Sequence, residues 1–266
     1  MGNRTLSDSQ LTEAILHRGT AFAAEIGAKA VFTSFDAIED PSILKSLPVD
    51  GTELVLVVRE KRLFNAVAEL GFRNLRMPPV PLSRMGQIKT AVIIAFSQRM
   101  LDTGETVVFE QALTLALELA TEGREGKSVG ALFVVGDYRN VIAYRQQSII
   151  NPFRGYSEKS RNILDEGMRD TVKNFAKLDG AFIIKGNGVI AAAGSHLKGV
   201  KPSAPLPPGL GSRHAAAAGI TAITKSIAIT ISESTGTVRI WRRGQIITEI
   251  ERPTPGLDQG PLPTLD

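Results

Sequence analysis

Residues 179–192 read DGAFIIKGNGVIAA, and this stretch decides the fold of the C-terminal half of the chain. Two apolar runs flank the dipeptide Asn187-Gly188. Asn-Gly between apolar runs predicts a tight β-hairpin, because both central turn positions need residues that tolerate positive φ. The first strand of the hairpin begins directly after Asp179-Gly180, so we expect the Asp179 carboxylate at the edge of a sheet, where ligands often bind.

Further strands and helices are predicted on both sides of this hairpin. The strands cover 129–135, 226–231, 237–241 and 245–250, and the helices cover 111–121, 157–178 and a short alanine-rich segment from Ser212. The last three strands are joined by short turns, which favours antiparallel neighbours. Residues 111–252 are therefore predicted to form an α/β domain with a mixed, largely antiparallel sheet flanked by helices.

The first 110 residues alternate between helical and strand patterns. A helix that ends at Gly27 carries one apolar face, formed by Leu11, Ala14, Ile15, Phe22 and Ile26. Helices are also predicted at 61–70 and 84–100, and strands at 30–33, 53–58, 75–77 and 105–109. This alternation predicts a small α/β domain with a mainly parallel sheet over residues 1–110. The tail 253–266 has four prolines and no cation, and we expect it to be disordered.

Length and composition exclude several classes of protein. The 266 residues carry a formal net charge of +4 and no cysteine, which excludes disulfides, thiolate zinc sites and thiol nucleophiles. The mild positive charge suits phosphorylated ligands, and we expect no nucleic-acid partner. The first residues, MGNRTLSDSQ, lack the apolar core of a signal peptide, and no apolar run of about 18 residues occurs, so we expect a cytoplasmic protein without a membrane partner.

Two glycine-rich nucleotide motifs almost occur and are rejected. Residues 126–128 read GKS and end like a P-loop, but Thr121 stands where the first glycine is needed, and a helix precedes the motif where a P-loop needs a strand. Residues 186–191 match the spacing of a dinucleotide fingerprint, but they lie in the predicted hairpin and do not open a helix.

A third glycine-containing segment is a better candidate. Residues 209–218 read GLGSRHAAAA, a loop that runs into a helix with Ser212 as the expected N-cap. Free amides and the positive dipole end make such a helix start an anion site, and Arg213 can bind phosphate through two hydrogen bonds. The alternative is a capped helix whose arginine faces water. An arginine in the first turn opposes the helix dipole, so a ligand explains its position better than stability does.

Carboxylates occur at two further places. Asp179 precedes a predicted strand, and residues 232–235, which read SEST, follow another. Each place alone also fits an ordinary polar turn. Together, Asp179 and Glu233 supply a carboxylate pair for a divalent metal, while the helix start with Arg213 supplies a phosphate site. This combination indicates metal-assisted nucleotide chemistry.

Four blocks of the sequence resemble the diadenylate cyclase (DAC) domain in order and spacing. They read VGALFVV at 129–135, DGAFIIKGN at 179–187, GSRHAAA at 211–217 and SESTG at 232–236. The resemblance covers about residues 111–252. It implies that the protein condenses two ATP into cyclic di-AMP and releases two pyrophosphates.

The resemblance also implies roles for residues of this chain. Asp179 is the expected catalytic residue; it binds Mn²⁺ or Mg²⁺ together with Glu233 and helps to deprotonate the ribose 3′-OH. The expected substrate-binding residues are Gly180, Ala181, Leu197, Gly211, Ser212, Arg213, His214, Ser232 and Glu233. One such domain holds one ATP, whereas the product needs two, so we expect a homo-oligomer that contains a face-to-face DAC dimer.

Two positions depart from the family pattern. The family commonly has Arg-His-Arg where this chain has Arg213-His214-Ala215, so one phosphate-facing cation is missing. Some members also carry a histidine at the position of Leu178. These departures leave a second hypothesis open, a nucleotide-binding sensor of the same fold that has lost turnover.

The first 110 residues resemble, more weakly, the C-terminal domain of pyruvate kinase. Residues 23–31, AAEIGAKAV, and 104–109, GETVVF, carry this similarity. A similar N-terminal domain is found in archaeal-type cyclases. No catalytic set is recognisable in this part, so we expect it to have a regulatory or oligomerising role.

Overall fold

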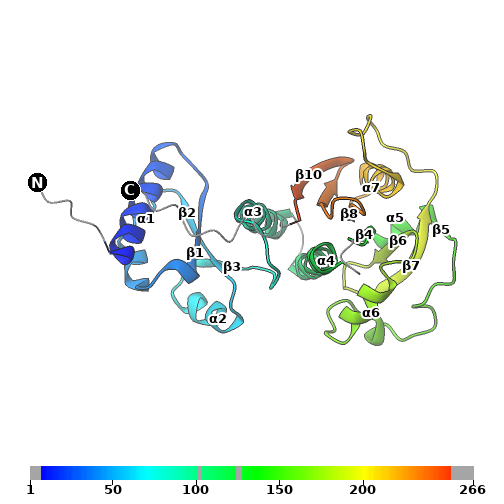
Figure 1. Cartoon of the computed structure of the whole chain (residues 1–266), viewed down its shortest axis with the longest axis horizontal. Coiled ribbons are helices and arrows are strands. Elements are labelled where there is room, and N and C mark those ends of the chain that lie inside the picture. The colour runs from blue at the N-terminus through cyan, green and yellow to red at the C-terminus, as the bar shows by residue number, and fades with distance from the viewer. Residues whose placement is uncertain (1–6, 101–102, 124–127, 253–266) are drawn as a thin grey trace, which may run out of the picture. The chain divides into compact units, whose positions relative to one another are not determined.

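The computed structural model describes residues 7–100, 103–123 and 128–252 (Figure 1). Residue contacts divide the chain into two compact units, with the division between Pro79 and Val80. The sequence pattern predicts a boundary near residue 110. The difference concerns helix α3 (Arg84–Met100), which packs against α4 (Thr103–Glu122) and β10 of the second unit.

The first unit is a parallel three-stranded sheet with helices. Its strands lie in the order β1-β2-β3, with β1 (Ala30–Ser34), β2 (Glu53–Val58) and β3 (Arg73–Arg76). The helices α1 (Asp8–Glu25) and α2 (Lys61–Glu69) and two short 3₁₀ segments accompany the sheet. The core is made of leucine and valine side chains, including Leu44, Leu54, Leu56, Val58 and Val67. The prediction of a small α/β unit with a parallel sheet is confirmed.

The apolar face expected on α1 is exposed. Leu11, Ile15, Phe22 and Ile26 keep between 47% and 62% of their surface accessible. The buried side of the helix instead carries Leu16, Thr20 and Ala23. The Thr20 hydroxyl is satisfied there, because it donates to the Leu16 carbonyl at 2.8 Å.

The second unit contains a seven-stranded mixed sheet in the order β10-β9-β8-β4-β6-β7-β5. Its strands are β4 (Ala131–Val135), β5 (Arg145–Gln147), β6 (Ala181–Ile184), β7 (Ile190–Leu197), β8 (Ile227–Ile231), β9 (Val238–Arg242) and β10 (Gln245–Ile250). Only β4 and β6 pair in parallel, and all other neighbours are antiparallel. The largely antiparallel sheet and the β6–β7 hairpin are therefore confirmed. The turn differs in detail from the prediction, because Gly188 has a φ of 88° whereas Asn187 does not take a positive φ.

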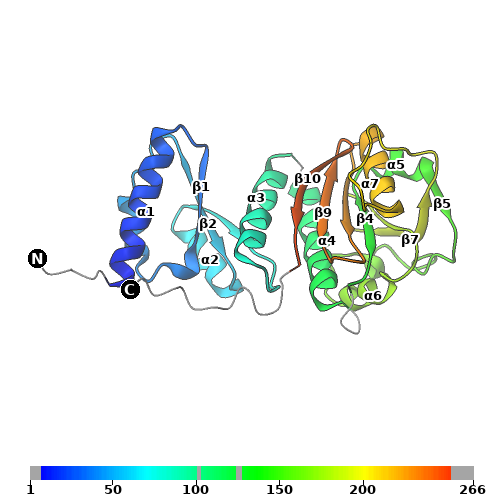
Figure 2. The ribbon, with the colours of Figure 1, turned by 45° about the horizontal axis from the view of Figure 1, so that its top comes forward.

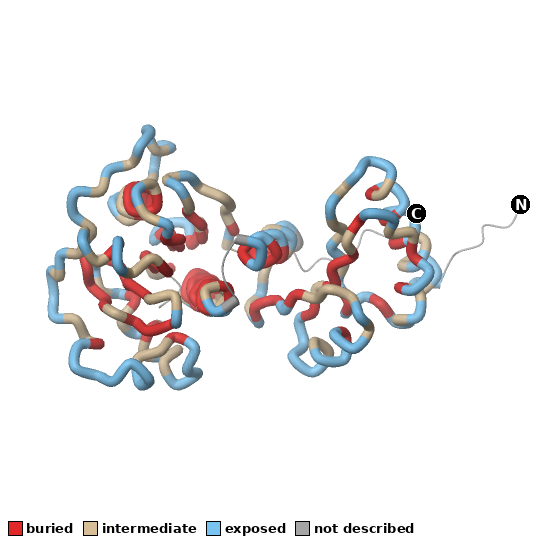
Figure 3. The backbone as a smooth tube through the Cα atoms, turned by 180° about the vertical axis from the view of Figure 1, so that it is seen from behind, coloured by how far each residue is buried: buried red, intermediate tan, exposed pale blue. Residues whose placement is uncertain are grey.

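Helices cover both faces of this sheet (Figures 1 and 2). Helix α7 (Ser212–Ile223) packs Ala217, Ala218 and Ile220 against one face, where Trp241 is also buried. On the other face, Phe133 and Phe182 contact each other in the sheet, and Phe153 and Phe175 extend this aromatic cluster toward α6 (Met168–Phe175). Helix α4 also packs on β4 and β8. Figure 3 shows the buried backbone concentrated in the sheet and in α4.

Two predicted elements of this region were wrong. The strand expected at 105–109 is part of α4, which is helical from Thr103 to Glu122. The long helix expected at 157–178 is limited to α6, and a 3₁₀ turn at 159–161 and turns precede it. The short helix α5 (Tyr138–Val141) was not expected. Among the described residues, no helix is both long enough and apolar enough to cross a membrane.

Candidate active site

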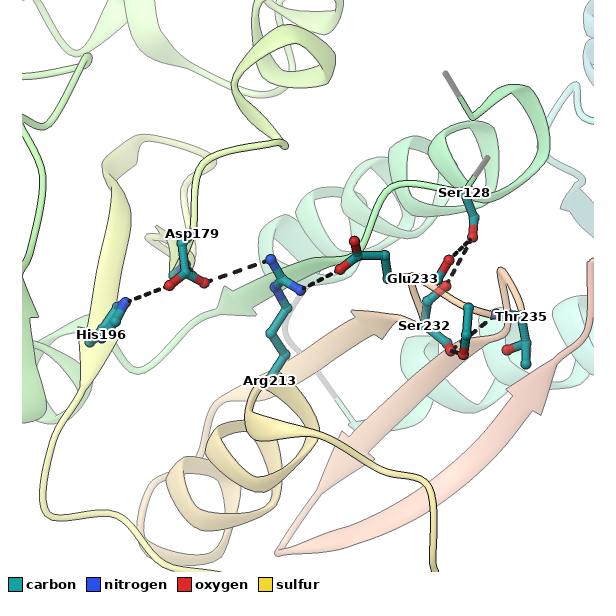
Figure 4. Close-up of polar contacts among 9 residues, drawn as sticks. Ser128, Asp179, His196, Arg213, Ser232, Glu233 and Thr235 are labelled. Atoms are coloured by element: carbon teal, nitrogen blue, oxygen red, sulfur yellow. Dashed lines mark hydrogen bonds and ion pairs between the residues drawn. The ribbon is translucent and has the colours of Figure 1, made fainter. Parts of the chain in front are cut away.

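Four strand ends meet at one edge of the seven-stranded sheet. The pairs Ala131↔Ile231 and Ala181↔Ser195 place the starts of β4 and β6 beside the ends of β8 and β7. Polar residues continue from each of these ends, which brings together segments that are up to about a hundred residues apart in the chain. The sheet topology therefore builds one polar edge from Ser128, Asp179, His196 and Glu233 (Figure 4).

The N-terminus of α7 adds the cation at this edge. Gly211 is the N-cap and Ser212 the first helical residue, so the expected N-cap at Ser212 is shifted by one position. The amides of His214 and Ala215 both donate to the Gly211 carbonyl. The amides before them belong to the first turn, whose N–H groups have no partner within a helix. Ser212 and Arg213 are thus placed where an anion can bind.

Arg213 links the two carboxylates predicted for this site (Figure 4). Its guanidinium lies 3.3 Å from Glu233 Oε2 and 3.7 Å from Asp179 Oδ1. Asp179 also lies 3.2 Å from His196 Nε2 and accepts a hydrogen bond from the Gly180 amide at 2.9 Å. Only 24% of the Arg213 side chain is exposed, against 73% for Asp179 and 74% for Glu233. The arginine is therefore held in place, while both carboxylates remain open to a ligand.

Two glycines make room for these contacts. A Cβ atom on Gly130 would lie 2.8 Å from Arg213 Nη1 and 3.0 Å from Glu233 Cβ, so a larger residue would require the arginine or Glu233 to shift. A Cβ atom on Gly180 would lie 2.7 Å from the Ser195 amide nitrogen, and its φ of +103° also favours glycine. Gly180 therefore lets Asp179 approach the end of β7.

Two adjoining cavities open at this edge. The larger, about 700 Å³, is lined by Ser128, Gly209, Gly211, Ser212, Arg213, His214, Ile231, Ser232, Glu233, Ser234 and Arg252. The smaller, about 160 Å³, is lined by Leu132, Asp179, Gly180, Ala181, Ser195, His196, Leu197, Ser212, Arg213 and Ala216. Ser212 and Arg213 line both cavities, so they mark the place where the two meet.

His214 lines the larger cavity but is mostly turned into the protein. Its imidazole is buried, packs near the Trp241 ring at a centroid distance of 6.1 Å, and lies 3.4 Å from Arg239 Nη1. Burial, together with the charges of Arg239 and Arg213, lowers the pKa of His214 to about 4. The ring is thus neutral near pH 7.

Every residue predicted for the site lies at one or both cavities. Three further residues were missed by sequence reasoning: Ser128, His196 as a neighbour of Asp179, and Arg252. The Ser128 hydroxyl donates to the Glu233 carbonyl at 2.5 Å and so ties the loop after β8 to the segment before β4. Arg252 reaches the larger cavity from the end of β10, where its guanidinium donates to the Thr121 carbonyl at 3.2 Å.

The carboxylates fit a divalent metal that is shared with a phosphorylated ligand. Mg²⁺ usually binds through one or two carboxylates together with substrate phosphates, and keeps several waters. Asp179 and Glu233 provide such carboxylates, and His196 adds a nitrogen donor beside Asp179. Across the described parts of the chain, no group of three or more acidic, histidine or cysteine side chains is arranged to hold a metal ion by itself.

The second unit of the chain is similar to known proteins. The model of the DAC family, described as "DisA bacterial checkpoint controller nucleotide-binding", matches residues 118–246. A diadenylate cyclase of Methanocaldococcus jannaschii is 40% identical over 151 residues, which cover 57% of this chain and 48% of that protein. A diadenylate cyclase of Haloferax volcanii is 35% identical over 165 residues, which cover 62% of this chain and 59% of that protein.

The chain spans about half the length of these curated relatives. Among solved structures, a double mutant of DacA from Staphylococcus aureus is similar with a TM-score of 0.36 and 24% sequence identity. That similarity covers 55% of this chain and 87% of the other.

Proposed function

Since residues 118–246 match the model of the DAC family, we propose that this protein is a diadenylate cyclase, which condenses two ATP into cyclic di-AMP and releases two pyrophosphates. The observation that carries the proposal is the position of Arg213. It lies where two cavities meet, between the carboxylates of Asp179 and Glu233. A cation at that position is suited to the α-phosphate, where negative charge develops during nucleotidyl transfer.

In this proposal, ATP lies across both cavities. The adenosine occupies the smaller cavity, where Gly180, Ala181 and Leu197 are lining residues and the adenine lies near 195–197. The triphosphate extends past Ser212 and Arg213 into the larger cavity, where Ser232 and Ser234 supply hydroxyl groups. The α-phosphate then lies at the start of α7, whose free amides favour an anion.

Asp179 is the residue that we assign to the 3′-OH. Its carboxylate is exposed at the smaller cavity, and the Gly180 amide and His196 restrict its orientation. It accepts the proton as the 3′-oxygen forms a bond to the α-phosphorus of the second ATP. The bond between that phosphorus and the β-phosphate oxygen breaks, and pyrophosphate leaves.

Arg252 supplies the phosphate-facing cation that is absent at Ala215. Its guanidinium reaches the larger cavity, and one of its nitrogens is anchored by the Thr121 carbonyl. Gly236 leaves room for this side chain, since a Cβ atom there would lie 2.9 Å from Arg252 Cδ. We assign Arg252 to the β- and γ-phosphates, which depart as pyrophosphate.

We further propose that Asp179 and Glu233 hold Mn²⁺ or Mg²⁺ together with the phosphates. A metal bound there would neutralise charge on the reacting phosphate. Arg213 separates the two carboxylates, so the phosphate must draw the arginine toward itself before both carboxylates can share one ion.

Assembly and location complete the proposal. Each linkage of cyclic di-AMP joins the 3′-oxygen of one nucleotide to the α-phosphate of the other, so two protomers face each other across a two-fold axis. The N-terminal unit, similar to the C-terminal domain of pyruvate kinase, has an oligomerising or regulatory role. We place the activity in the cytoplasm, where ATP is available, without a membrane or nucleic-acid partner.

The direct test is product formation. Purified protein is incubated with ATP and Mn²⁺ or Mg²⁺, and the nucleotides are separated by chromatography. The expected result is cyclic di-AMP and two equivalents of pyrophosphate, both formed at least about a hundredfold more slowly by Asp179→Asn. Tight ATP binding without any product would instead support a nucleotide sensor of the same fold and overturn the cyclase proposal.

A further inference from the structure

A separate cavity of about 530 Å³ lies beside the edge strand β5. It is lined by Arg145, Gln147, Ile150, Asn151, Phe153, Arg154, Gly155, Arg161 and Ala191. None of these residues lines either cavity of the candidate active site. The volume is within the range that is usual for sites of small molecules.

Three arginines line this cavity and form no close ion pair with any described residue, although Glu158 lies near enough to Arg161 to interact with its charge. In the described parts of the chain, no carboxylate lies within 4.0 Å of Arg145, Arg154 or Arg161, although several other arginines of the same unit form such ion pairs. Like charges that share a cavity repel one another, and the repulsion is stronger than in bulk water because the surroundings are less polar. A bound anion would relieve it.

The inner wall of the cavity is fixed before any ligand arrives. Arg161 donates to the Tyr156 carbonyl at 3.0 Å and to the Ile190 carbonyl at 2.6 Å. Asn151 donates to the Ala191 carbonyl at 3.0 Å and accepts from the Ala193 amide at 3.2 Å. These bonds tie the 151–161 segment to β7, so Arg161 is held in position, while Arg145 and Arg154 make no ion pair that a ligand would have to break.

From this arrangement, we propose that the cavity binds a phosphate-bearing ligand of nucleotide size. Guanidinium groups match the oxygens of a phosphate in pairs and are more weakly hydrated than ammonium groups. Three of them suit a ligand with several negative charges, such as a diphosphate or a dinucleotide. The buried Phe153 adds an apolar wall for a non-phosphate part.

This second cavity adjoins the proposed nucleoside cavity through one side chain. Gln147 lines the second cavity and donates to the Ala193 carbonyl at 2.7 Å. Its amide oxygen accepts from the Ser195 hydroxyl at 2.9 Å, and Ser195 lines the nucleoside cavity. Residues of β7 line both sites, so the two are neighbours along this strand, but they use different cations.

The stoichiometry of pyrophosphate binding tests the inference. Inorganic pyrophosphate is titrated calorimetrically into the full chain, into Arg145→Ala/Arg154→Ala and into Arg213→Ala. We expect two sites per wild-type chain, of which the double variant binds more weakly at the one in the second cavity and Arg213→Ala binds more weakly at the other. Each arginine removed should weaken the affected site by about tenfold. Arg139→Ala/Lys225→Ala, which removes two exposed cations elsewhere in the same unit, should bind like the wild type.

Further measurements distinguish a loss of binding from a loss of folding, and show which part of the ligand the cavity recognises. A double variant Arg145→Lys/Arg154→Lys keeps the charge without the planar fork and should show intermediate weakening. Titrating AMP and cyclic di-AMP into Arg213→Ala tells whether a nucleoside adds affinity to the phosphate. Unchanged binding at both sites in a folded Arg145→Ala/Arg154→Ala protein overturns the inference. If only the active site fails to bind pyrophosphate, the proposed function is in doubt and the second site stands.

Discussion

At the scale of single residues, Asp179 combines exposure with a fixed orientation. Replacing Asp179 with Asn retains an acceptor for the Gly180 amide and removes the charge. We expect turnover to fall by at least about a hundredfold, since general-base and metal-binding roles are each worth that much. Because the side chain is 73% exposed, the melting temperature should stay within a few degrees of the wild type.

The matched control for this change is Asp170→Asn, an exposed carboxylate on α6 away from the site. Initial rates of cyclic di-AMP formation and thermal melts are measured for both variants. Near-normal rates in Asp179→Asn would remove this residue from the mechanism.

The role proposed for Arg252 gives a more specific prediction, because this residue is assigned to the part of ATP that leaves. Arg252→Ala should raise KM for ATP and weaken product inhibition by pyrophosphate, each by about tenfold, since a charge-assisted hydrogen bond is lost. Arg252→Lys should restore part of the effect, because it returns the charge. If pyrophosphate inhibits Arg252→Ala as strongly as the wild type, the assignment of the β- and γ-phosphates to this residue is wrong.

The lowered pKa of His214 predicts that the stability of the protein depends on pH. Its pKa in the folded protein is about 4, below the value of 6.5 for a free histidine, so the unfolded chain binds the proton more readily. The contribution of neutral His214 to the free energy of unfolding is fully present above about pH 6.5. It is lost as the pH falls toward 4, and the loss amounts to about 3 kcal/mol. Urea unfolding at pH 7 and pH 4 should therefore show a larger loss for the wild type than for His214→Gln. An equal loss in both proteins would contradict this origin.

At the scale of elements, a buried ion pair connects α4 to α6. Glu118 is 3% exposed and lies 3.0 Å from Lys173, and it also pairs with Arg169. Glu118→Ala should lower the free energy of unfolding by about 2 kcal/mol, less than for a fully buried pair because both cations can still reach water. Glu122→Ala, which removes a 59% exposed partner of the same Lys173, should cost less than about 0.5 kcal/mol in the same urea titration.

Elements defined by local patterns were predictable from the sequence. The β6–β7 hairpin follows from Asn187-Gly188, and α7 follows from an alanine run after Gly211. The prediction of a strand at 105–109 was wrong because it considered only the β-branched residues of that segment. In the structure, Val108 and Phe109 continue the buried pattern of Ala112, Leu113 and Ala116 along α4, so a long buried helix overrides a short strand pattern.

The site was predictable only where its residues lie in contiguous motifs. Asp179, Arg213 and Glu233 belong to such motifs. His196 reaches Asp179 through the pairing of β6 with β7, and Arg252 reaches the larger cavity only because β10 ends beside it. No local sequence pattern marks Gly130, because the side chain next to it, Arg213, belongs to another element.

At the scale of the whole molecule, the two-protomer reaction predicts that activity depends on concentration. Specific activity should fall when the protein is diluted below the dimerisation constant, because a single DAC domain cannot form both linkages. Rates are compared with light scattering over the same dilution series. Constant activity per subunit under conditions where only monomer is present would exclude the face-to-face dimer.

Mixing two defective proteins tests the same arrangement. In the proposed dimer, each linkage uses Asp179 of one protomer and Arg213 of the other. When an Asp179→Asn protomer pairs with an Arg213→Ala protomer, one linkage therefore has both residues intact and the other linkage has both residues replaced. The linear dinucleotide, with one linkage formed, should therefore accumulate to levels that neither variant reaches alone. A mixture that yields only the average of the two variants would show that the protomers do not share the reaction.

The two residues shared by both cavities have a consequence for chemical probes. Because Ser212 and Arg213 line the smaller and the larger cavity alike, small fragments bound in the two spaces would lie next to each other. Joining such fragments makes the second contact intramolecular, and the effective concentration then raises affinity without new interactions. A short linker that carries one negative charge to Arg213 would compete with Glu233 for the arginine.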